Sequence, residues 1–174
     1  VADTEVTGRY RFKGNALTVV PGLPPITEAA GQVNFTARDL SIPQAGGILF
    51  GKPMQLTAAT LADRGVRFDA RGEAALAAVH AAYPWPAMAH VSGETPWTAQ
   101  ITVRGRQADV QIDTPLTGVA SSLPAPFNKS ALTAWPTRVS VQMTPGQPAV
   151  LNATLADQAQ LQLAIPRDEA AGAG

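Results

Sequence analysis

Cysteine is absent from this chain of 174 residues, and charged residues are scarce, at 15% of the total. Without cysteine there is no disulfide framework, thiolate zinc site or cysteine nucleophile to consider. The thirteen basic and thirteen acidic residues cancel, so the chain has neither a basic field for nucleic acid nor an acidic one for cations. We therefore expect no nucleic-acid partner.

Long apolar runs are also missing. No stretch approaches the roughly 18 residues that a membrane helix needs, and the start lacks the charged, apolar and small-residue order of a signal peptide. The first residues already resemble a strand, Glu5–Phe12, whereas Ala170–Gly174 carries no structural pattern. We interpret the chain as an internal piece of a longer protein, with a disordered tail over residues 167–174.

What the chain does have is a repeated alternation of apolar and polar residues. Successive side chains of a strand point to opposite faces of a sheet, so this period of two places the apolar residues on one face. One wet face is typical of antiparallel sheet. The pattern occurs in Gln32–Ala37, Met54–Ala58, Val66–Ala70, Ala99–Arg104, Val110–Asp113, Val139–Thr144 and Leu161–Ile165.

Glycine, proline and polar residues separate these strands at short intervals, which predicts an antiparallel meander. We expect a single β segment over residues 1–166. The predicted turns lie at residues 13–15, 21–25, 43–47, 51–53, 62–65, 105–107 and 145–148. The apolar parity also changes between Ala37 and Leu40, which predicts a further turn or bulge near Arg38 and Asp39.

One helix interrupts the meander. Residues 73–83 are rich in alanine, and Pro84 ends the helical pattern. The helix would join two halves, about residues 5–72 and 92–166, which show a faint internal repeat. The fold class is therefore mainly β with one short α-helix.

Several motifs with possible chemistry fail on physical grounds. The stretch Gly46–Pro53 has the glycine and lysine spacing of a phosphate loop, but proline occupies the magnesium-ligating position and no helix follows, so a turn between strands is favoured. His80 and His90 lack an evident third metal ligand. No nucleophile elbow surrounds the serines at 121 and 122. We expect no enzyme activity, no cofactor and no metal.

Two interpretations of the apolar face remain open. It can be the core of a closed β-sandwich, in which two sheets face each other at about 10 Å. Such a module would bind a protein or a glycan in the cell envelope. Alternatively, it is the inner face of one curved sheet that stays open as a groove for acyl chains. Periodicity cannot separate these two.

A more specific signal is a Leu-x-Gly pattern followed by Leu-Pro-x-Pro-Phe-x-Lys within Asp113–Lys129. This segment resembles the AsmA-like YhdP family of large Gram-negative envelope proteins. Gly14–Ile26, Gly31–Gly51 and Ser92–Trp97 are similar to other parts of the family, so the resemblance extends from about Gly14 to Met143. The residues that match the main motif are Leu116, Gly118, Leu123, Pro124, Pro126, Phe127 and Lys129.

The resemblance implies a long, taco-shaped β-groove that bridges the periplasm, carries phospholipid between the inner and outer membranes and supports outer-membrane integrity. It also implies an inner-membrane anchoring helix that this chain lacks. The expected partners are phospholipid acyl chains, adjacent segments of the full-length chain and a second copy of this piece. The predicted groove-lining residues are Val33, Phe35, Leu56, Phe68, Ile101, Val103, Val110, Ile112, Val139, Val141, Leu161 and Leu163.

Overall fold

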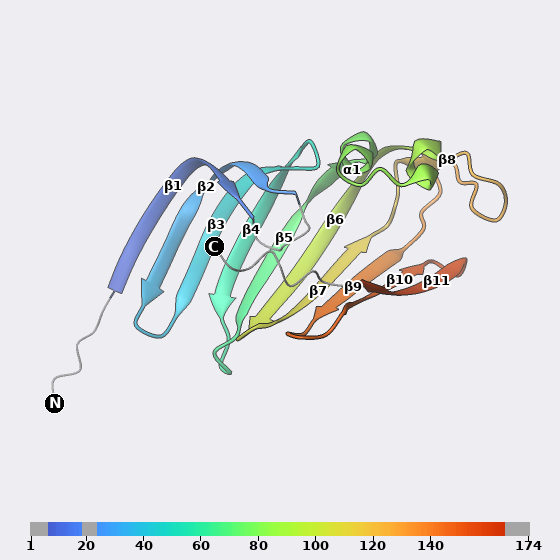
Figure 1. The fold of residues 1–174 in the computed structure, drawn as a ribbon. Helices are drawn as coiled ribbons and strands as arrows, with labels where there is room; N and C mark the ends of the chain where they lie inside the picture. Colours follow the sequence, from blue (N-terminus) through green and yellow to red (C-terminus); the bar gives the residue numbers. More distant parts are fainter. Residues whose placement is uncertain (1–6, 19–23, 166–174) are drawn as a thin grey trace, which may run out of the picture.

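The computed structural model describes residues 7–18 and 24–165, and the strands in this part form one antiparallel sheet (Figure 1). The sheet order follows the chain from β1 to β7 and then β9 to β11, while β8 pairs with β6. The strands are β1 (Thr7–Leu17), β2 (Ile26–Thr36), β3 (Leu40–Leu49), β4 (Lys52–Thr60), β5 (Val66–Ala75), β6 (Val91–Arg104), β7 (Gln107–Thr114), β8 (Val119–Ser121), β9 (Thr137–Met143), β10 (Ala149–Leu155) and β11 (Ala159–Ile165). The predicted meander is confirmed.

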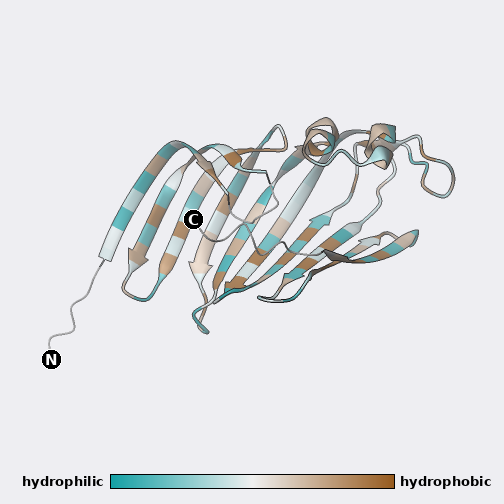
Figure 2. Ribbon diagram, viewed as in Figure 1, coloured by the Kyte–Doolittle hydropathy of each residue, from teal (hydrophilic) through white to brown (hydrophobic). Residues whose placement is uncertain are grey.

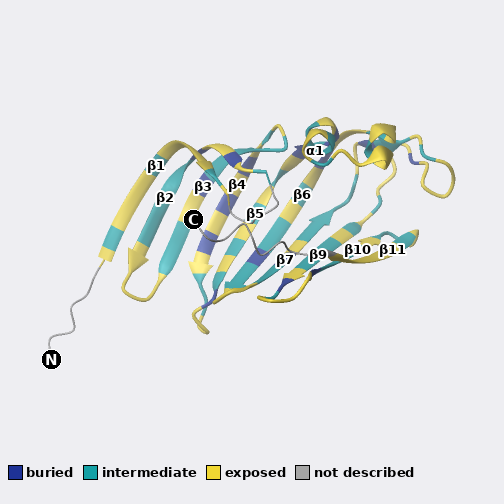
Figure 3. Cartoon of the chain, viewed as in Figure 1, coloured by how far each residue is buried: buried dark blue, intermediate teal, exposed yellow. Residues whose placement is uncertain are grey.

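The register places apolar residues of neighbouring strands side by side on one face, which we call the groove face. In β4 and β5, every second residue is more buried than its neighbours, as the alternation predicts (Figures 2 and 3). One row of directly paired residues crosses the sheet from β3 to β11. It consists of Ile42, Ala58, Phe68, Ile101, Val110, Val141, Leu151 and Leu163.

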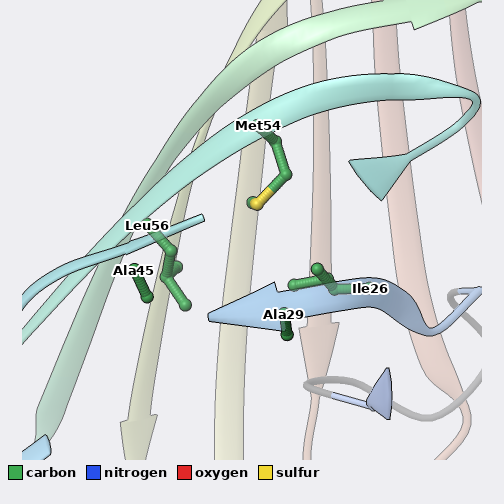
Figure 4. Packing of buried hydrophobic residues seen from close by; sticks show 5 residues of the cluster. All are labelled: Ile26, Ala29, Ala45, Met54 and Leu56. Carbon is green, nitrogen blue, oxygen red and sulfur yellow. The ribbon is translucent and has the colours of Figure 1, made fainter. Parts of the chain in front are cut away.

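Small residues let the sheet bend inward at β3. Ile26 and Ala29 of β2 belong to the same buried cluster as Met54 and Leu56 of β4, although β3 lies between these strands (Figure 4). The contact is possible because Gly47 has no side chain: a Cβ there would collide with Ile26. The bend explains how one sheet buries Met54 and Leu56 to 5% and 6% exposure.

Two of the predicted turns are instead irregularities inside strands. Gly14, at a φ of +73°, lies in β1 where the register shifts between Phe12 and Asn15. The register of β3 shifts between Ile42 and Ala45, within the predicted turn 43–47. Such bulges bend a strand and increase its twist, so glycine and proline curve the sheet at these positions rather than ending a strand. Of the predicted turn 21–25, residues 21–23 lie outside the described part.

The other hairpin connections agree with the prediction. Residues 37–39 connect β2 to β3, where the Thr36 hydroxyl accepts hydrogen bonds from the amides of Arg38 and Asp39. Phe50 and Gly51, both with positive φ, form the turn between β3 and β4. The stretch Gly46–Pro53 is therefore a β-hairpin, as the proline in it indicated.

The predicted helix exists but begins later than residue 73. Helix α1 comprises Leu76–Ala82, and a 3-10 helix, η1, comprises Pro86–His90. Residues 73–75 extend β5, where they pair with residues 94–96 of β6. The strand ladder thus overrides the helical preference of two alanines.

The ends of the strands form two different rims. The first, which we call the turn rim, contains the tight connections 37–39, 61–65, 105–106 and 144–148. The second, the capped rim, contains residues 75–93 and 115–136, with α1, η1 and β8 (Figure 1). No helix within the described residues is both long and apolar enough to cross a membrane.

The sheet is open along its strand order. Among the described residues, β1 pairs only with β2 and β11 only with β10, so these two strands are its edges. The strands form one curved sheet and not two facing sheets, which confirms the curved, one-sided groove and not the closed sandwich. Within the described residues, the two expected halves, 5–72 and 92–166, meet in this sheet because β5 pairs with β6. The predicted tail, 167–174, lies outside the described part.

Candidate functional site

The groove face is the candidate site, and its centre gathers most of the predicted lining residues. Leu56, Ile101 and Val110 are buried, with exposed fractions between 5% and 7%. Around Ile101 and Val110 lie half-buried side chains that pack against them. This set comprises Phe68, Val103, Ile112 and Val141 among the predicted residues, together with Ala108. Val139 lies on the same face, paired with Ile112.

The remaining predicted residues lie at the two ends of the groove face. Val33 and Phe35 belong to β2, next to the edge strand β1, and Leu161 and Leu163 belong to the edge strand β11. Phe35, Leu161 and Leu163 are 42%, 50% and 43% exposed. The apolar side chains therefore continue to both open ends of the sheet, where fewer neighbours cover them.

The prediction from the sequence missed several groove-face residues. Met54, Ala58 and Met143 are among the most buried side chains, and Tyr10, 59% exposed, pairs with Val33 at the β1 edge. The alternation could have identified Met54, Ala58 and Met143, because each continues the parity of a predicted residue on the same strand. Tyr10 could not be found in this way, because no predicted residue lies in β1; its pairing with Val33 places it on the groove face.

Near the capped rim, the groove face carries a polar strip. Thr95 is 5% exposed, and its hydroxyl lies 3.0 Å from the hydroxyl of Thr114. Thr114 pairs with Thr137, whose hydroxyl donates to the Trp135 carbonyl at 3.0 Å. Trp97 follows Thr95 by two residues. Its indole nitrogen is buried and has no hydrogen-bond partner among the described residues. The strip separates the apolar centre from the rim.

A shallow cavity of about 440 Å³ lies beside this strip. Its lining includes Trp97, Thr114 and Thr137 from the groove face, and Arg138 and Asp113 from the opposite face. Arg138 Nε donates to Asp113 Oδ1 at 2.6 Å. Burial raises the pKa of Asp113, but the hydrogen bonds from Gln111 and Arg138 outweigh it and hold that pKa below 3.8.

The opposite face of the sheet is polar, and several of its charged side chains pair with acidic or amide side chains. Arg67 donates to both carboxylate oxygens of Asp69, which holds the pKa of Asp69 below 3.8. Arg71 donates to Gln55, and Arg11 donates to Gln32. Arg11, Gln32, Gln55 and Arg71 contribute to the lining of a wide, open hollow of about 1300 Å³. Paired and uncharged groups thus keep this face wet without a strong net field.

The motif residues build the capped rim around one buried lysine. Lys129 is 8% exposed, and its ammonium donates to the carbonyls of Leu116 and Val119, each at 2.7 Å, and of Ser130 at 3.1 Å. All three of its N–H groups therefore have acceptors. Burial lowers the pKa of Lys129 from its ordinary value of 10.5.

The other motif residues set the path of the chain toward Lys129. Gly118 has a φ of +90°, and a Cβ there would collide with the Glu94 carbonyl. Leu116 also has a positive φ, and its carbonyl accepts from the Lys129 ammonium. Leu123 is half-buried, and Pro124 accepts the Phe127 amide at 2.9 Å in a turn that includes Pro126. The motif is thus a folding unit that positions the capped rim.

The two histidines lie on different elements, His80 in α1 and His90 at the end of η1. Among the described residues, no three His, Asp or Glu side chains come close enough to hold a metal ion.

The comparisons with known proteins give one match. The model of a family described as YhdP protein matches residues 2–172. No curated protein and no solved structure matches the chain.

Proposed function

Because the chain belongs to the YhdP family, we propose that it is a non-enzymatic segment of a large protein that carries phospholipid between the inner and outer membranes. Membership indicates an envelope protein of the lipid-transport type in a Gram-negative bacterium. Within this proposal, the segment lies in the periplasm, its groove face holds acyl chains, and the full-length protein supports outer-membrane integrity from an inner-membrane anchor.

The observation that carries the proposal is the unbroken apolar row from β3 to β11, which includes Phe68, Ile101, Val110 and Val141. The row runs across the strands, so every added strand lengthens the apolar path. Each acyl methylene transferred from water onto such a surface gains about 0.8 kcal/mol. This free energy is similar at successive positions of the row, so an acyl chain can shift along the groove.

The polar back of the sheet supports the same proposal. Arg67 with Asp69, and Arg138 with Asp113, form ion pairs within that face. A lipid in the groove would therefore meet no charged side chain in the central row, while the outer face stays in water. We infer that neighbouring segments, or a second copy, continue the sheet at β1 and β11, each of which pairs with only one strand among the described residues.

The experiment compares charges on the two faces of the same strands. Ile101→Asp and, in a separate variant, Ile112→Asp place a carboxylate on the groove face. Thr102→Asp and Gln111→Asp place it on the opposite face of β6 and β7. Native mass spectrometry and lipid extraction then measure the phospholipid bound to each purified protein.

We expect the groove-face variants to lose at least about tenfold of the bound phospholipid, because an acyl chain cannot solvate a carboxylate. The opposite-face variants should retain it. Circular dichroism checks that each variant is folded, and Ile112, which is only half-buried, provides the gentler of the two groove-face changes. A folded Ile112→Asp protein that binds as much phospholipid as the wild type would contradict the proposal.

A further inference from the structure

The capped rim is almost free of charge. Between Glu73 and Glu94 the sequence contains no Asp, Glu, Lys or Arg, and between Asp113 and Arg138 it contains only Lys129. Lys129 is buried, and all its N–H groups are used by backbone carbonyls. The two segments of the rim therefore present no charged side chain at their surface, and Lys52 and Glu94, at adjoining strand ends, pair with each other at 2.6 Å.

The two uncharged segments form one surface although they are distant in the sequence. Residues 91–93 of β6 pair with residues 119–121 of β8 (Figure 1). The amide of Ser122 donates to the carbonyl of His90 at 2.9 Å, which ties the loop after β8 to η1. The rim is thus a continuous structure, positioned by backbone hydrogen bonds.

Large apolar side chains project from this uncharged surface. Trp85, between α1 and η1, is 61% exposed, and its ring lies 6.1 Å from the ring of Tyr83. In the loop between β8 and β9, Phe127 is 38% exposed and Leu132 is 94% exposed. Exposing a leucine so fully leaves nearly all of its apolar surface in water.

We propose that the capped rim inserts Trp85, Phe127 and Leu132 into the interfacial layer of a lipid bilayer, and that it does so without requiring anionic lipid. Tryptophan favours the boundary between headgroups and acyl chains, where its ring has an apolar and a polar environment. An uncharged surface enters this layer without the cost of removing ions from water. Because the only cation is buried, anionic headgroups gain nothing from it.

The shape of the rim favours a bilayer over a folded protein partner. Trp85 projects from one segment, whereas Phe127 and Leu132 project from the other, at separate positions. A rigid partner would need a matching pocket for each projection, packed as densely as a protein interior. A fluid interface accepts separate projections without such pockets.

The test measures vesicle binding of the whole chain by flotation. Vesicles of pure phosphatidylcholine and vesicles containing phosphatidylglycerol should bind the wild type equally, within about twofold. Raising the salt from about 0.1 M to about 1 M, which shortens the Debye length from about 10 Å to about 3 Å, should leave binding unchanged. The triple variant Trp85→Asn, Phe127→Asn and Leu132→Asn should bind at least about tenfold more weakly.

The control removes an apolar side chain that belongs neither to the capped rim nor to the groove-lining residues. Leu61→Asn changes a half-buried residue in the connection between β4 and β5 at the turn rim, and it should bind vesicles like the wild type. Quenching of tryptophan fluorescence by brominated phosphatidylcholine should fall in Trp85→Phe, because Trp85 would be the tryptophan within the bilayer.

Three results would overturn the inference: no flotation with either vesicle, binding only to anionic vesicles and lost in salt, or a dimer in size-exclusion chromatography that the rim variant abolishes. The last would identify a second copy as the occupant. Phospholipid retained in the groove is measured separately by mass spectrometry. A protein that does not bind vesicles can therefore still support the proposed groove, and a protein without bound phospholipid can still support membrane insertion of the rim.

Discussion

The two rims of the groove differ in how they are built. The turn rim consists of short hairpin connections with charged side chains, such as Asp63 and Arg104, whose oxygen and nitrogen lie 2.6 Å apart. The capped rim consists of longer connections with α1, η1 and β8, and its one charge, on Lys129, is buried. The turn rim depends on exposed ion pairs, whereas the capped rim depends on buried hydrogen bonds.

This difference indicates which rim contributes more to the stability of the sheet. A surface ion pair contributes between 0 and about 1 kcal/mol, because water screens it and both side chains lose freedom. A buried donor that satisfies several buried acceptors is more costly to remove, since each acceptor left without a partner costs about 1–3 kcal/mol. The capped rim should therefore be much more sensitive to substitution than the turn rim.

The largest expected effect is that of Lys129→Met at the capped rim. Methionine keeps an unbranched side chain but removes three bonds to a charged donor: the Val119 carbonyl loses its ammonium partner, and the carbonyls of Leu116 and Ser130 keep only the amides of Val119 and Thr133. We expect the free energy of unfolding to fall by at least about 3 kcal/mol, as measured by urea denaturation.

The control for that substitution is Lys13→Met, since Lys13 lies exposed in β1. A change within about 0.5 kcal/mol is expected there, as for most surface positions. If Lys129→Met were as mild as Lys13→Met, the motif lysine would not hold the capped rim together.

A smaller difference in stability is expected between alanine substitutions of two glycines, one from each rim. Gly93 has a φ of +108°, and a Cβ there would collide with the Gly118 carbonyl, whereas Gly105 has a φ of +59° with nothing within 4 Å. Gly105→Ala meets only the backbone strain of about 1 kcal/mol. Gly93→Ala adds the collision, so we expect it to cost about 2 kcal/mol more by urea denaturation. Equal costs would show that β8 moves away from β6 without penalty.

The third effect is a pH dependence that belongs to Lys129. Its pKa is lower in the folded protein than the ordinary 10.5, so between these two values the unfolded chain binds more protons. The free energy of unfolding should therefore rise with pH through this window, relative to Lys129→Met. Urea midpoints of both proteins from about pH 8 to about pH 10 measure the difference. A difference that stays constant over this range would contradict the burial of the charge.

The smallest effect is expected from Asp63→Asn at the turn rim. Hydrogen bonds from the Arg104 side chain and the Gly65 amide hold the pKa of Asp63 below 3.8. The contribution of this carboxylate is present above pH 3.8 and is lost as the pH falls through the lower, folded value. Thermal midpoints of the wild type and Asp63→Asn should therefore converge on acidification, from a difference that is already small. If Asp63→Asn lost more stability than Gly93→Ala, the turn rim would be the more sensitive of the two rims, contrary to our expectation.

Much of the fold could be predicted from the sequence because strand alternation is a local signal. The period of two placed Phe68, Ile101 and Val110 on one face, and the register brings them together as a row. The turn at Arg38 and Asp39 was also predictable, since the parity of apolar residues changes there. These features depend on neighbours within a few residues.

The remaining features depend on residues that are distant in the sequence. Glycine at 14 and proline at 43 are typical of turns, but in the folded sheet they lie at bulges, because strand pairing continues past them. Residues 73–75 favour helix, yet residues 94–96 pair with them. The hydrogen bonds of Lys129 connect it to carbonyls as far back as Leu116, and no local pattern indicates that a lysine is buried there.

The register of the sheet has a mechanical consequence. The strands are joined one after another, so a pull that separates β1 from β11 loads every strand pair in series, and the weakest pair yields first. The β1–β2 and β2–β3 pairs are each interrupted by two register shifts, whereas the pairs from β4 to β7 have none. Under tension across the strands, the sheet should therefore peel open from its β1 end while the row through Ile101 and Val110 stays intact.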